Sequence, residues 1–172
     1  MRNSAWIWLP MAAAVSTSVY ARTYFTVEQA QRAIFPGAVL TQAFFTLTDA
    51  QKREIEQRSG VNVRFTEIRL WKVAEGGYFV IDEVVGKHEL ITYAIGLTAE
   101  GAVKQIEIMD YRESYGYEIR NSRWRGQFTG KTPADALKLE SDIQYISGAT
   151  LSSRHVTEGV KRVLATYETA FR

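Results

Sequence analysis

The fold class follows from residues 78–109, which read YFVIDEVVGKHELITYAIGLTAEGAVKQIEIM. Apolar, β-branched and aromatic residues fill three runs, 78–85, 88–97 and 103–109, as is typical of strands. Gly86-Lys87 separates the first two runs, and Ala99-Glu100-Gly101 lies between the second and the third. Because connections this short join antiparallel neighbours, the sequence predicts an antiparallel sheet.

Two short helices are predicted before this sheet. Thr26 and Thr48 are each followed three residues later by a glutamine, which is the spacing of a capping box. The first helix is expected to extend to Ile34, where Phe-Pro-Gly follows, and the second to about Arg58. Gly60 is a typical residue to end the second helix.

Shorter elements are predicted around the sheet. The alternation of apolar and polar residues over 61–65 indicates a half-buried strand. A helical piece is expected over 123–128, a second short helix from Thr132-Pro133, and one more strand over 142–146. A last helix is predicted because apolar residues recur at the spacing of one helical face, namely Val156, Val160, Val163, Leu164, Tyr167 and Phe171.

The predicted fold class is α+β. We expect a single domain in which an antiparallel sheet is flanked by helices, with a C-terminal helix following Ser147-Gly148-Ala149-Thr150. A chain of 172 residues is long enough for one sizeable core and short for two. The net charge of +2 does not favour a nucleic-acid surface, and Arg120, Arg123 and Arg125 are interpreted as a solvated face or as salt-bridge partners.

The chain contains no cysteine. Disulfides, thiolate zinc sites, iron–sulfur clusters and c-type haem attachment are therefore excluded. A redox cofactor would have to be held by other chemistry, and a phosphoester on a hydroxyl is one such bond. His88 and His155 are the only histidines, and they have no carboxylate partner at ligand spacing, so no metal site is expected.

Residues 1–21 are predicted to be a signal peptide. Arg2 precedes an apolar stretch within 5–19, and Ala21 is a suitable small residue before the cleavage site. The apolar stretch is shorter than the roughly 20 residues that a membrane-spanning helix needs. Export to the periplasm is the expectation, and retention of the segment as an uncleaved membrane anchor is the alternative.

The junction Ser147-Gly148-Ala149-Thr150 is the candidate functional site. The start of a helix collects unpaired backbone N–H groups and the positive end of the helix dipole, where a phosphate is well placed. Thr150 adds a hydroxyl that could hold a phosphate by a hydrogen bond or as a covalent ester. An ordinary turn capped by Ser or Thr is the competing interpretation, and Ser152 and Ser153 are candidate caps.

Residues 147–153, SGATLSS, resemble the flavinylation motif of the FMN-binding domain family, which includes flavin-carrying subunits of sodium-pumping NADH:quinone oxidoreductases and of Rnf complexes. Residues 111–116 and the segment 124–131 are also similar to family segments, in the same order along the chain. The resemblance implies that a flavin transferase esterifies the FMN phosphate to Thr150. Gln144 stands where the family motif has an aspartate.

The resemblance also implies a domain organisation. Residues 61–172 would be the FMN-binding domain, 22–60 an N-terminal helical segment, and 1–21 the signal peptide. Within the FMN-binding domain, Ser147, Gly148 and Ala149 would form the backbone on the phosphate side, with Ser152 nearby.

A second candidate site is the loop 113–117. Glu113, Tyr115 and Gly116 would contact the isoalloxazine ring, because glycine lets the main chain approach and a tyrosine, Tyr115 or Tyr117, covers a ring face. Exposed turn chemistry is the alternative for this loop. Trp124 is also a candidate for the ring pocket, and a core contact with Phe128, four residues on, is its alternative.

Two basic side chains are weaker candidates. Lys87 could balance negative charge on reduced flavin, while a solvated strand end is the alternative interpretation of Lys87 and His88. His155 follows Thr150 closely enough along the helix that contact with the phosphate is a further hypothesis.

Three functions remain open from the sequence. The first is an exported FMN flavoprotein that transfers electrons between membrane-bound or periplasmic redox partners, as a carrier or subunit rather than a stand-alone catalyst. The second is a non-covalent FMN-binding sensor or storage module. The third is a cofactor-less interaction domain.

Overall fold

A computed structural model of the chain describes residues 22–171. The predicted signal peptide over 1–21, its cleavage after Ala21 and the alternative membrane anchor therefore concern residues outside the described part. Within 22–171, no helix combines the length and the apolar character needed to cross a bilayer.

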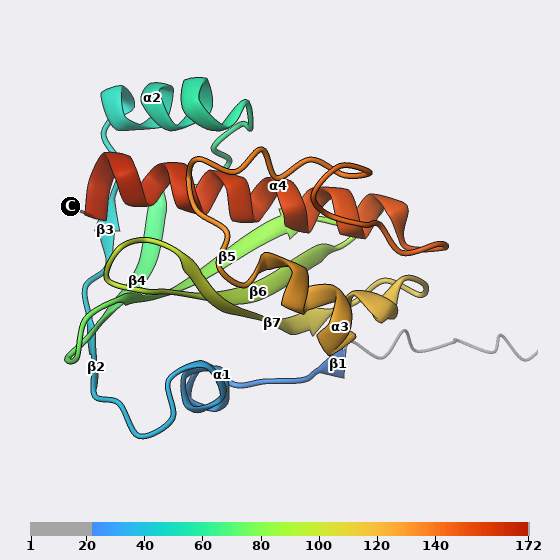
Figure 1. The fold of residues 1–172 in the computed structure, drawn as a ribbon, viewed down its shortest axis with the longest axis horizontal. Helices are drawn as coiled ribbons and strands as arrows, with labels where there is room; N and C mark the ends of the chain where they lie inside the picture. Colours follow the sequence, from blue (N-terminus) through green and yellow to red (C-terminus); the bar gives the residue numbers. More distant parts are fainter. Residues whose placement is uncertain (1–21, 172) are drawn as a thin grey trace, which may run out of the picture.

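An antiparallel sheet forms the centre of the fold, and the predicted α+β class is confirmed (Figure 1). The order of the strands is β1-β7-β6-β5-β4-β2, and the short β3 pairs separately with β4. The central strands pair along most of their length, with Val80 opposite Ile95 and Ile95 opposite Ile106. The strands are β1 (Arg22–Thr23), β2 (Leu40–Gln42), β3 (Phe45–Thr46), β4 (Glu67–Val73), β5 (Tyr78–Val85), β6 (Leu90–Leu97) and β7 (Val103–Tyr111).

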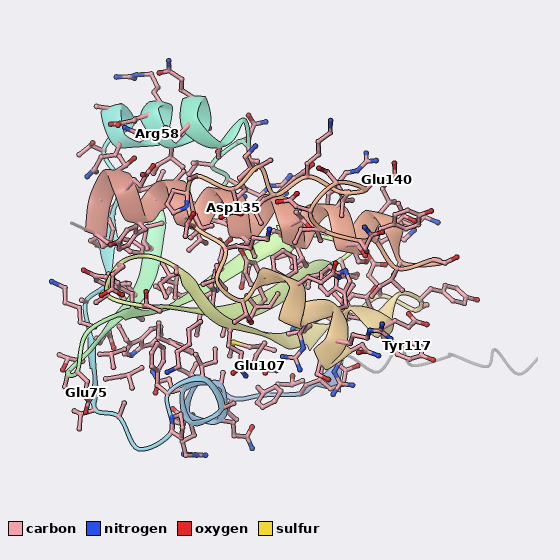
Figure 2. All side chains as sticks on the ribbon, in the orientation of Figure 1. Arg58, Glu75, Glu107, Tyr117, Asp135 and Glu140 are labelled. Atoms are coloured by element: carbon pink, nitrogen blue, oxygen red, sulfur yellow. The ribbon has the colours of Figure 1, made fainter. Side chains whose placement is uncertain are left out.

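The helices form layers on the two faces of the sheet. Figure 1 shows α4 lying across one face, α2 outside α4, and α1 against the opposite face. Arg58 on α2, labelled in Figure 2, pairs with Glu168 beyond the end of α4 at 3.2 Å. The α-helices are α1 (Val27–Ile34), α2 (Asp49–Ser59), α3 (Ser122–Arg125) and α4 (Thr150–Thr166). The 3-10 helices are η1 (Tyr117–Arg120) and η2 (Gly126–Phe128), and η3 (Tyr167–Phe171) is a π-helix that follows α4.

Alternation along the strands supplies both sides of the core. On β5, Val80 and Val84 point into the cluster under α4, whereas Phe79 and Ile81 belong to the cluster under α1. This division follows from the period of two in a strand, which sends successive side chains to opposite faces. A sheet buried on both faces explains why residues 78–109 read as nearly continuous apolar runs.

Both predicted helix starts are confirmed. The Thr26 hydroxyl accepts the Gln29 N–H at 3.3 Å, and the Thr48 hydroxyl accepts the Gln51 N–H at 3.2 Å, each within a complete capping box. Gly60 ends α2 in the left-handed conformation, with φ of 67°.

Three predicted short elements are wrong. The strand expected at 61–65 lies further along the chain, at β4, because Val63 packs with α2 and its N–H bonds to the Glu56 carboxylate at 2.9 Å. The helix expected from Thr132 is a set of turns, since the N–H groups of Leu137 and Lys138 bond to the Asp142 carboxylate instead of continuing a helical ladder.

The strand expected at 142–146 is the third error, and it is reduced to a single bridge between Leu139 and Ile143. The N–H groups of Asp142 and Ile143 both donate to the Lys138 carbonyl at 3.2 Å, and two later N–H groups of the segment donate to side chains. The Gln144 N–H donates to Gln127 and the Ile146 N–H donates to Ser153.

Candidate functional site

A cleft of about 520 Å³ lies at the N-terminal end of α4. Three segments that are distant in sequence form it: the β5–β6 turn, the loop after β7 and the start of α4. The lining residues are Lys87, His88, Glu113, Ser114, Tyr115, Gly148, Ala149, Thr150, Leu151 and Ser152. The fold thus brings together the phosphate-site and loop candidates of the sequence analysis.

The start of α4 is open to the cleft. The helix begins at Thr150, and among the described residues no side chain caps it at the Ala149 position. Gly148 before it has φ of +84°, a conformation that favours glycine, and the space beside its Cα is open. The exposed Thr150 hydroxyl therefore stands beside first-turn N–H groups and the positive end of a 17-residue helix dipole.

Ser152 and Ser153 do not cap the helix, contrary to the interpretation left open above. Both are buried within its first turn, with 6% and 0% of their surfaces exposed. The Ser152 hydroxyl lies 3.0 Å from the Tyr111 hydroxyl, and the Ser153 hydroxyl accepts the Ile146 N–H at 3.2 Å. These serines fix neighbouring segments instead of closing the N-terminus.

Tyr111, at the end of β7, was not identified from the sequence. Its hydroxyl donates to the Tyr115 carbonyl, so the Ser152 hydroxyl must donate to the tyrosine oxygen. Burial raises the pKa of Tyr111, while the Ser152 hydrogen bond opposes this rise. The phenol therefore joins the loop after β7 to the first turn of α4 as a neutral group.

Gly116 explains how the loop fits against this hydrogen-bond junction. It has φ of +90°, and a Cβ at this position would lie 2.5 Å from the Tyr111 hydroxyl and 3.3 Å from Ser152 Oγ. Only glycine gives the close approach. Gly116 thus lets the loop pack closely against Tyr111 and the first turn of α4, and its contact with the flavin ring stays a prediction.

Glu113 holds the β5–β6 turn. Its carboxylate accepts the N–H of His88 at 2.5 Å and that of Glu89 at 3.1 Å. Partial burial opposes ionisation, but these backbone donors hold the pKa of Glu113 below its ordinary value. The turn is thereby fixed with Lys87 and His88 at the cleft. The spacing of residues in the sequence does not indicate this contact.

Aromatic and apolar side chains form the outer rim. Tyr115 lines the cleft with 83% of its surface exposed, and Leu151 lines it with 43% exposed. Tyr117, labelled in Figure 2, lies beyond the lining and is 59% exposed. Of the two candidate ring-covering tyrosines, the structure places Tyr115 at the cleft.

Trp124 lies outside this cleft. It is buried, packs edge-on against Phe128 with ring centroids 5.2 Å apart, and donates its Nε1–H to the Gln144 carbonyl at 2.8 Å. It borders a separate cleft of about 620 Å³ together with Tyr145. The alternative interpretation of Trp124 as a core contact matches this position.

Two further candidates also lie apart from the lining. His155 borders a third cleft, of about 320 Å³, together with Arg162 on the same helix. Ser147 is an exposed residue of the turn that precedes Gly148. The described residues include no group of three or more histidine and carboxylate side chains arranged to hold a metal ion.

These features define the class of protein. An α+β domain with an open helix start, two basic residues and an aromatic rim around a cleft of about 520 Å³ is a domain for a phosphate-bearing, partly aromatic ligand. FMN fits this description, since its phosphate suits the helix start and its ring suits the rim. Thr150 and Gly148 would hold the phosphate end.

The comparison with protein families supports FMN as that ligand. The family described as FMN-binding domain matches residues 86–165, which include the β5–β6 turn, the loop after β7 and most of α4. Residues 86–165 of this chain therefore match the FMN-binding domain family, and FMN is the cofactor. The resemblance inferred from the sequence is confirmed.

Two curated relatives belong to ferredoxin:NAD(+) oxidoreductase complexes. The chain is 34% identical over 107 residues to a subunit of the proton-translocating ferredoxin:NAD(+) oxidoreductase complex of Clostridium ljungdahlii, a match that covers 55% of this chain and 57% of that protein. It is 32% identical over 82 residues to a subunit of the Na(+)-translocating ferredoxin:NAD(+) oxidoreductase complex of Acetobacterium woodii, covering 42% and 40%. The matches span about half the length of these relatives.

A solved structure shares the fold. The crystal structure of NqrC from Shewanella oneidensis superposes with a TM-score of 0.53 at 16% identity, covering 80% of this chain and 84% of that one. At this identity the likeness concerns the fold alone.

Proposed function

We propose that this chain is an exported electron-transfer flavoprotein whose FMN is esterified through its phosphate to Thr150. The observation that carries the proposal is the open start of α4. Within the described residues the helix has no side-chain cap, and the exposed Thr150 hydroxyl stands at the cleft.

The residues of the cleft suit the parts of FMN. First-turn N–H groups and the helix dipole would stabilise the phosphodiester that attachment creates. Lys87, on the turn that Glu113 fixes, would offset negative charge on the reduced ring. Tyr115 would cover one face of the ring.

The attachment step balances as a phosphoryl transfer. The Thr150 oxygen would form a bond to phosphorus and lose its proton, while a P–O bond of an activated flavin nucleotide, a phosphoanhydride of FMN, breaks and its leaving group departs. The protein would gain the mass of FMN less one water. A transferase would supply the base, because the described cleft places no carboxylate at hydrogen-bonding distance from Thr150.

Electron transfer is the function that this cofactor supports. FMN accepts and returns one or two electrons, and the protein contributes binding, orientation and charge. Because the matched relatives are named as subunits of ferredoxin:NAD(+) oxidoreductase complexes, we propose membrane-associated redox partners for this chain. Export to the periplasm is part of the proposal, and fractionation of an exporting host would test it.

The covalent bond is tested with Thr150→Val. This variant keeps the shape of the side chain and removes the hydroxyl, so acid-precipitated protein should lose all of its flavin. The matched control is Thr157→Val on the same helix, whose hydroxyl donates only to the Ser153 carbonyl at 2.7 Å. Intact mass of protein coexpressed with a flavin transferase should show one FMN less one water for wild type and for the control. Acid-stable flavin in Thr150→Val would contradict the assignment.

Non-covalent FMN binding is the second candidate function. Gln144 replaces the family aspartate, and its exposed side chain lies outside the FMN cleft, so the substitution could impair recognition by the transferase without altering the cleft. Flavin that binds but is released completely by acid would favour this candidate. Protein that stays colourless with FMN present would favour the cofactor-less interaction domain.

A further inference from the structure

The segment 129–149 leads into the flavin site without regular secondary structure apart from one bridge. Such a segment is normally mobile, because few backbone hydrogen bonds restrict it. Here its backbone is tied by side chains at three successive points. Each successive point lies nearer to Thr150 in the sequence than the one before it.

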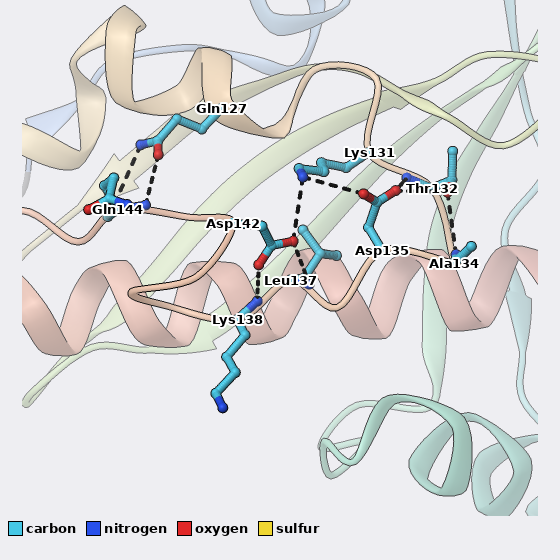
Figure 3. Close-up of polar contacts among 9 residues, drawn as sticks. All are labelled: Gln127, Lys131, Thr132, Ala134, Asp135, Leu137, Lys138, Asp142 and Gln144. Atoms are coloured by element: carbon cyan, nitrogen blue, oxygen red, sulfur yellow. Dashed lines mark hydrogen bonds and ion pairs between the residues drawn. The ribbon is translucent and has the colours of Figure 1, made fainter.

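The first tie is Asp142. Its carboxylate accepts the N–H groups of Leu137 at 2.9 Å and Lys138 at 2.6 Å, and it contacts the Lys131 ammonium at 3.4 Å (Figure 3). Burial opposes ionisation, yet the backbone donors lower the pKa of Asp142, so the tie is ionised at neutral pH.

The second tie is a clamp on the backbone of Gln144, made by Trp124 and Gln127. The Gln127 carboxamide accepts the Gln144 N–H at 2.8 Å and donates to the Gln144 carbonyl at 3.4 Å (Figure 3). The Trp124 indole donates to the same carbonyl at 2.8 Å. Both backbone groups of Gln144 are thus bound by side chains from the α3–η2 region, while its own side chain is exposed.

The third tie is Ser153, whose fully buried hydroxyl accepts the Ile146 N–H at 3.2 Å. From Ile146 the chain continues into a turn closed by the Ala149 N–H, which donates to the Ile146 carbonyl at 2.9 Å. Gly148 lies inside this turn and Thr150 begins the helix. The conformation of the phosphate turn therefore depends on where Gln144 and Ile146 are held.

We propose that Trp124, Gln127 and Ser153 are positioning residues that preform the turn 146–149 before the cofactor arrives. This inference rests on the proposed function of Thr150 as the attachment residue. The three side chains act through the backbone of Gln144 and Ile146, and Trp124 and Gln127 lie outside the FMN cleft. Without the clamp, only a fraction of the molecules would have the turn in its competent shape, and apparent affinity falls by that fraction.

The test uses flavin-free protein and two substitutions that remove hydrogen bonds, of which Gln127→Met changes the shape less. Gln127→Met has the same chain length without polar atoms, and Trp124→Phe keeps an aromatic ring without the donor. Amide hydrogen exchange at 145–149 should accelerate about tenfold in each, while exchange in β6 and β7 stays at the wild-type rate. Thr166→Val is the control, since it removes a buried hydroxyl near the C-terminal end of α4 that donates to the Arg162 carbonyl at 2.9 Å and contacts none of the three positioning residues.

The second readout is the kinetics of FMN attachment by a flavin transferase at varied concentrations of this protein. We expect Gln127→Met to raise KM about tenfold and to leave kcat unchanged, because the correctly shaped fraction reacts normally. Gln127→Glu keeps the acceptor for the Gln144 N–H and loses only the donor. Its KM should therefore lie between the values for wild type and for Gln127→Met. A purely structural role would change the melting temperature without this KM pattern.

The outcomes separate the two proposals. Wild-type exchange at 145–149 in both Gln127→Met and Trp124→Phe would overturn the positioning role, whether or not flavin attaches. Absence of acid-stable flavin on wild-type protein would overturn the attachment to Thr150, and the exchange measurement would still decide whether the clamp preforms the turn. If Gln127→Met fails to fold, Gln127→Glu supplies the exchange measurement, and an unchanged rate there counts against the clamp.

Discussion

The hydrogen-bond junction of Tyr111, Tyr115 and Ser152 provides the sharpest prediction. Tyr111→Phe removes one hydroxyl and leaves the ring, which is 2% exposed. Two hydrogen bonds disappear, one to the Tyr115 carbonyl and one from the Ser152 hydroxyl. Ser152, itself 6% exposed, loses its partner inside the first turn of α4.

The expected cost follows from these two bonds. A typical intramolecular hydrogen bond contributes about 0.5–1.5 kcal/mol, so the free energy of unfolding should fall by about 2 kcal/mol. For a domain of this size, each kcal/mol lowers the melting temperature by about 2–4 °C, so the melting temperature should fall by about 6 °C. The loop 112–116 should also loosen from α4.

The assay combines thermal unfolding with hydrogen exchange of the loop amides. Tyr93→Phe is the matched control, because Tyr93 is also buried and its hydroxyl donates to Asp82 at 2.6 Å, away from the FMN cleft. Asp82 keeps its ion pair with Arg162 at 2.6 Å in that variant. Both substitutions should destabilise the protein, and only Tyr111→Phe should accelerate exchange at 112–116 and weaken FMN binding. Equal exchange at 112–116 in the two variants would refute the reasoning.

Three further predictions concern the surroundings of the site. Glu113→Gln should reduce the acid sensitivity of the β5–β6 turn. Because the folded pKa of Glu113 is depressed, its stabilisation of the turn is complete above about pH 4.5 and is lost as the pH falls through the folded pKa. Unfolding curves of the variant, measured from pH 7 to pH 3, should therefore converge with those of wild type at the acid end. Gly159→Ala should lower the free energy of unfolding by about 1–3 kcal/mol, since its Cβ would lie 2.6 Å from the Tyr93 hydroxyl. Gly126→Ala has open space and a helical φ of −60°, so it should be neutral or slightly stabilising. Equal midpoints of the two variants in urea titrations would contradict the packing argument. Lys87→Met should lower the reduction potential of bound FMN, and a potentiometric titration that matched wild type would remove Lys87 from the proposed role.

Much of the fold was predictable because its signals are local. The capping boxes at Thr26 and Thr48, the stop at Gly60 and the face of α4 each depend on residues within a few positions of one another. The three central strands were identifiable from their apolar runs. The errors at 61–65, from Thr132 and at 142–146 occurred where side chains compete for backbone groups, which periodicity does not reveal.

The candidate site was predictable only in part. The turn 147–150 was found because small residues before a helix have a recognisable chemistry, and Tyr115 was found as an aromatic residue beside glycine. The role of Glu113 as the anchor of the β5–β6 turn and the hydroxyl of Tyr111 were missed, and two positions for Trp124 stayed open. The division of the chain at residue 60 and the attachment to Thr150 stay predictions.

The amino-acid sequence by itself determined the α+β class, the start of the last helix and several of the residue types that line the cleft, because these depend on neighbours along the chain. The tertiary structure alone decided which of those residues share a cleft. The hydrogen bonds that assemble the cleft join Tyr111 to Ser152 across 41 positions and Glu113 to His88 across 25, and such pairs become neighbours only when the strands pair and α4 packs on the sheet.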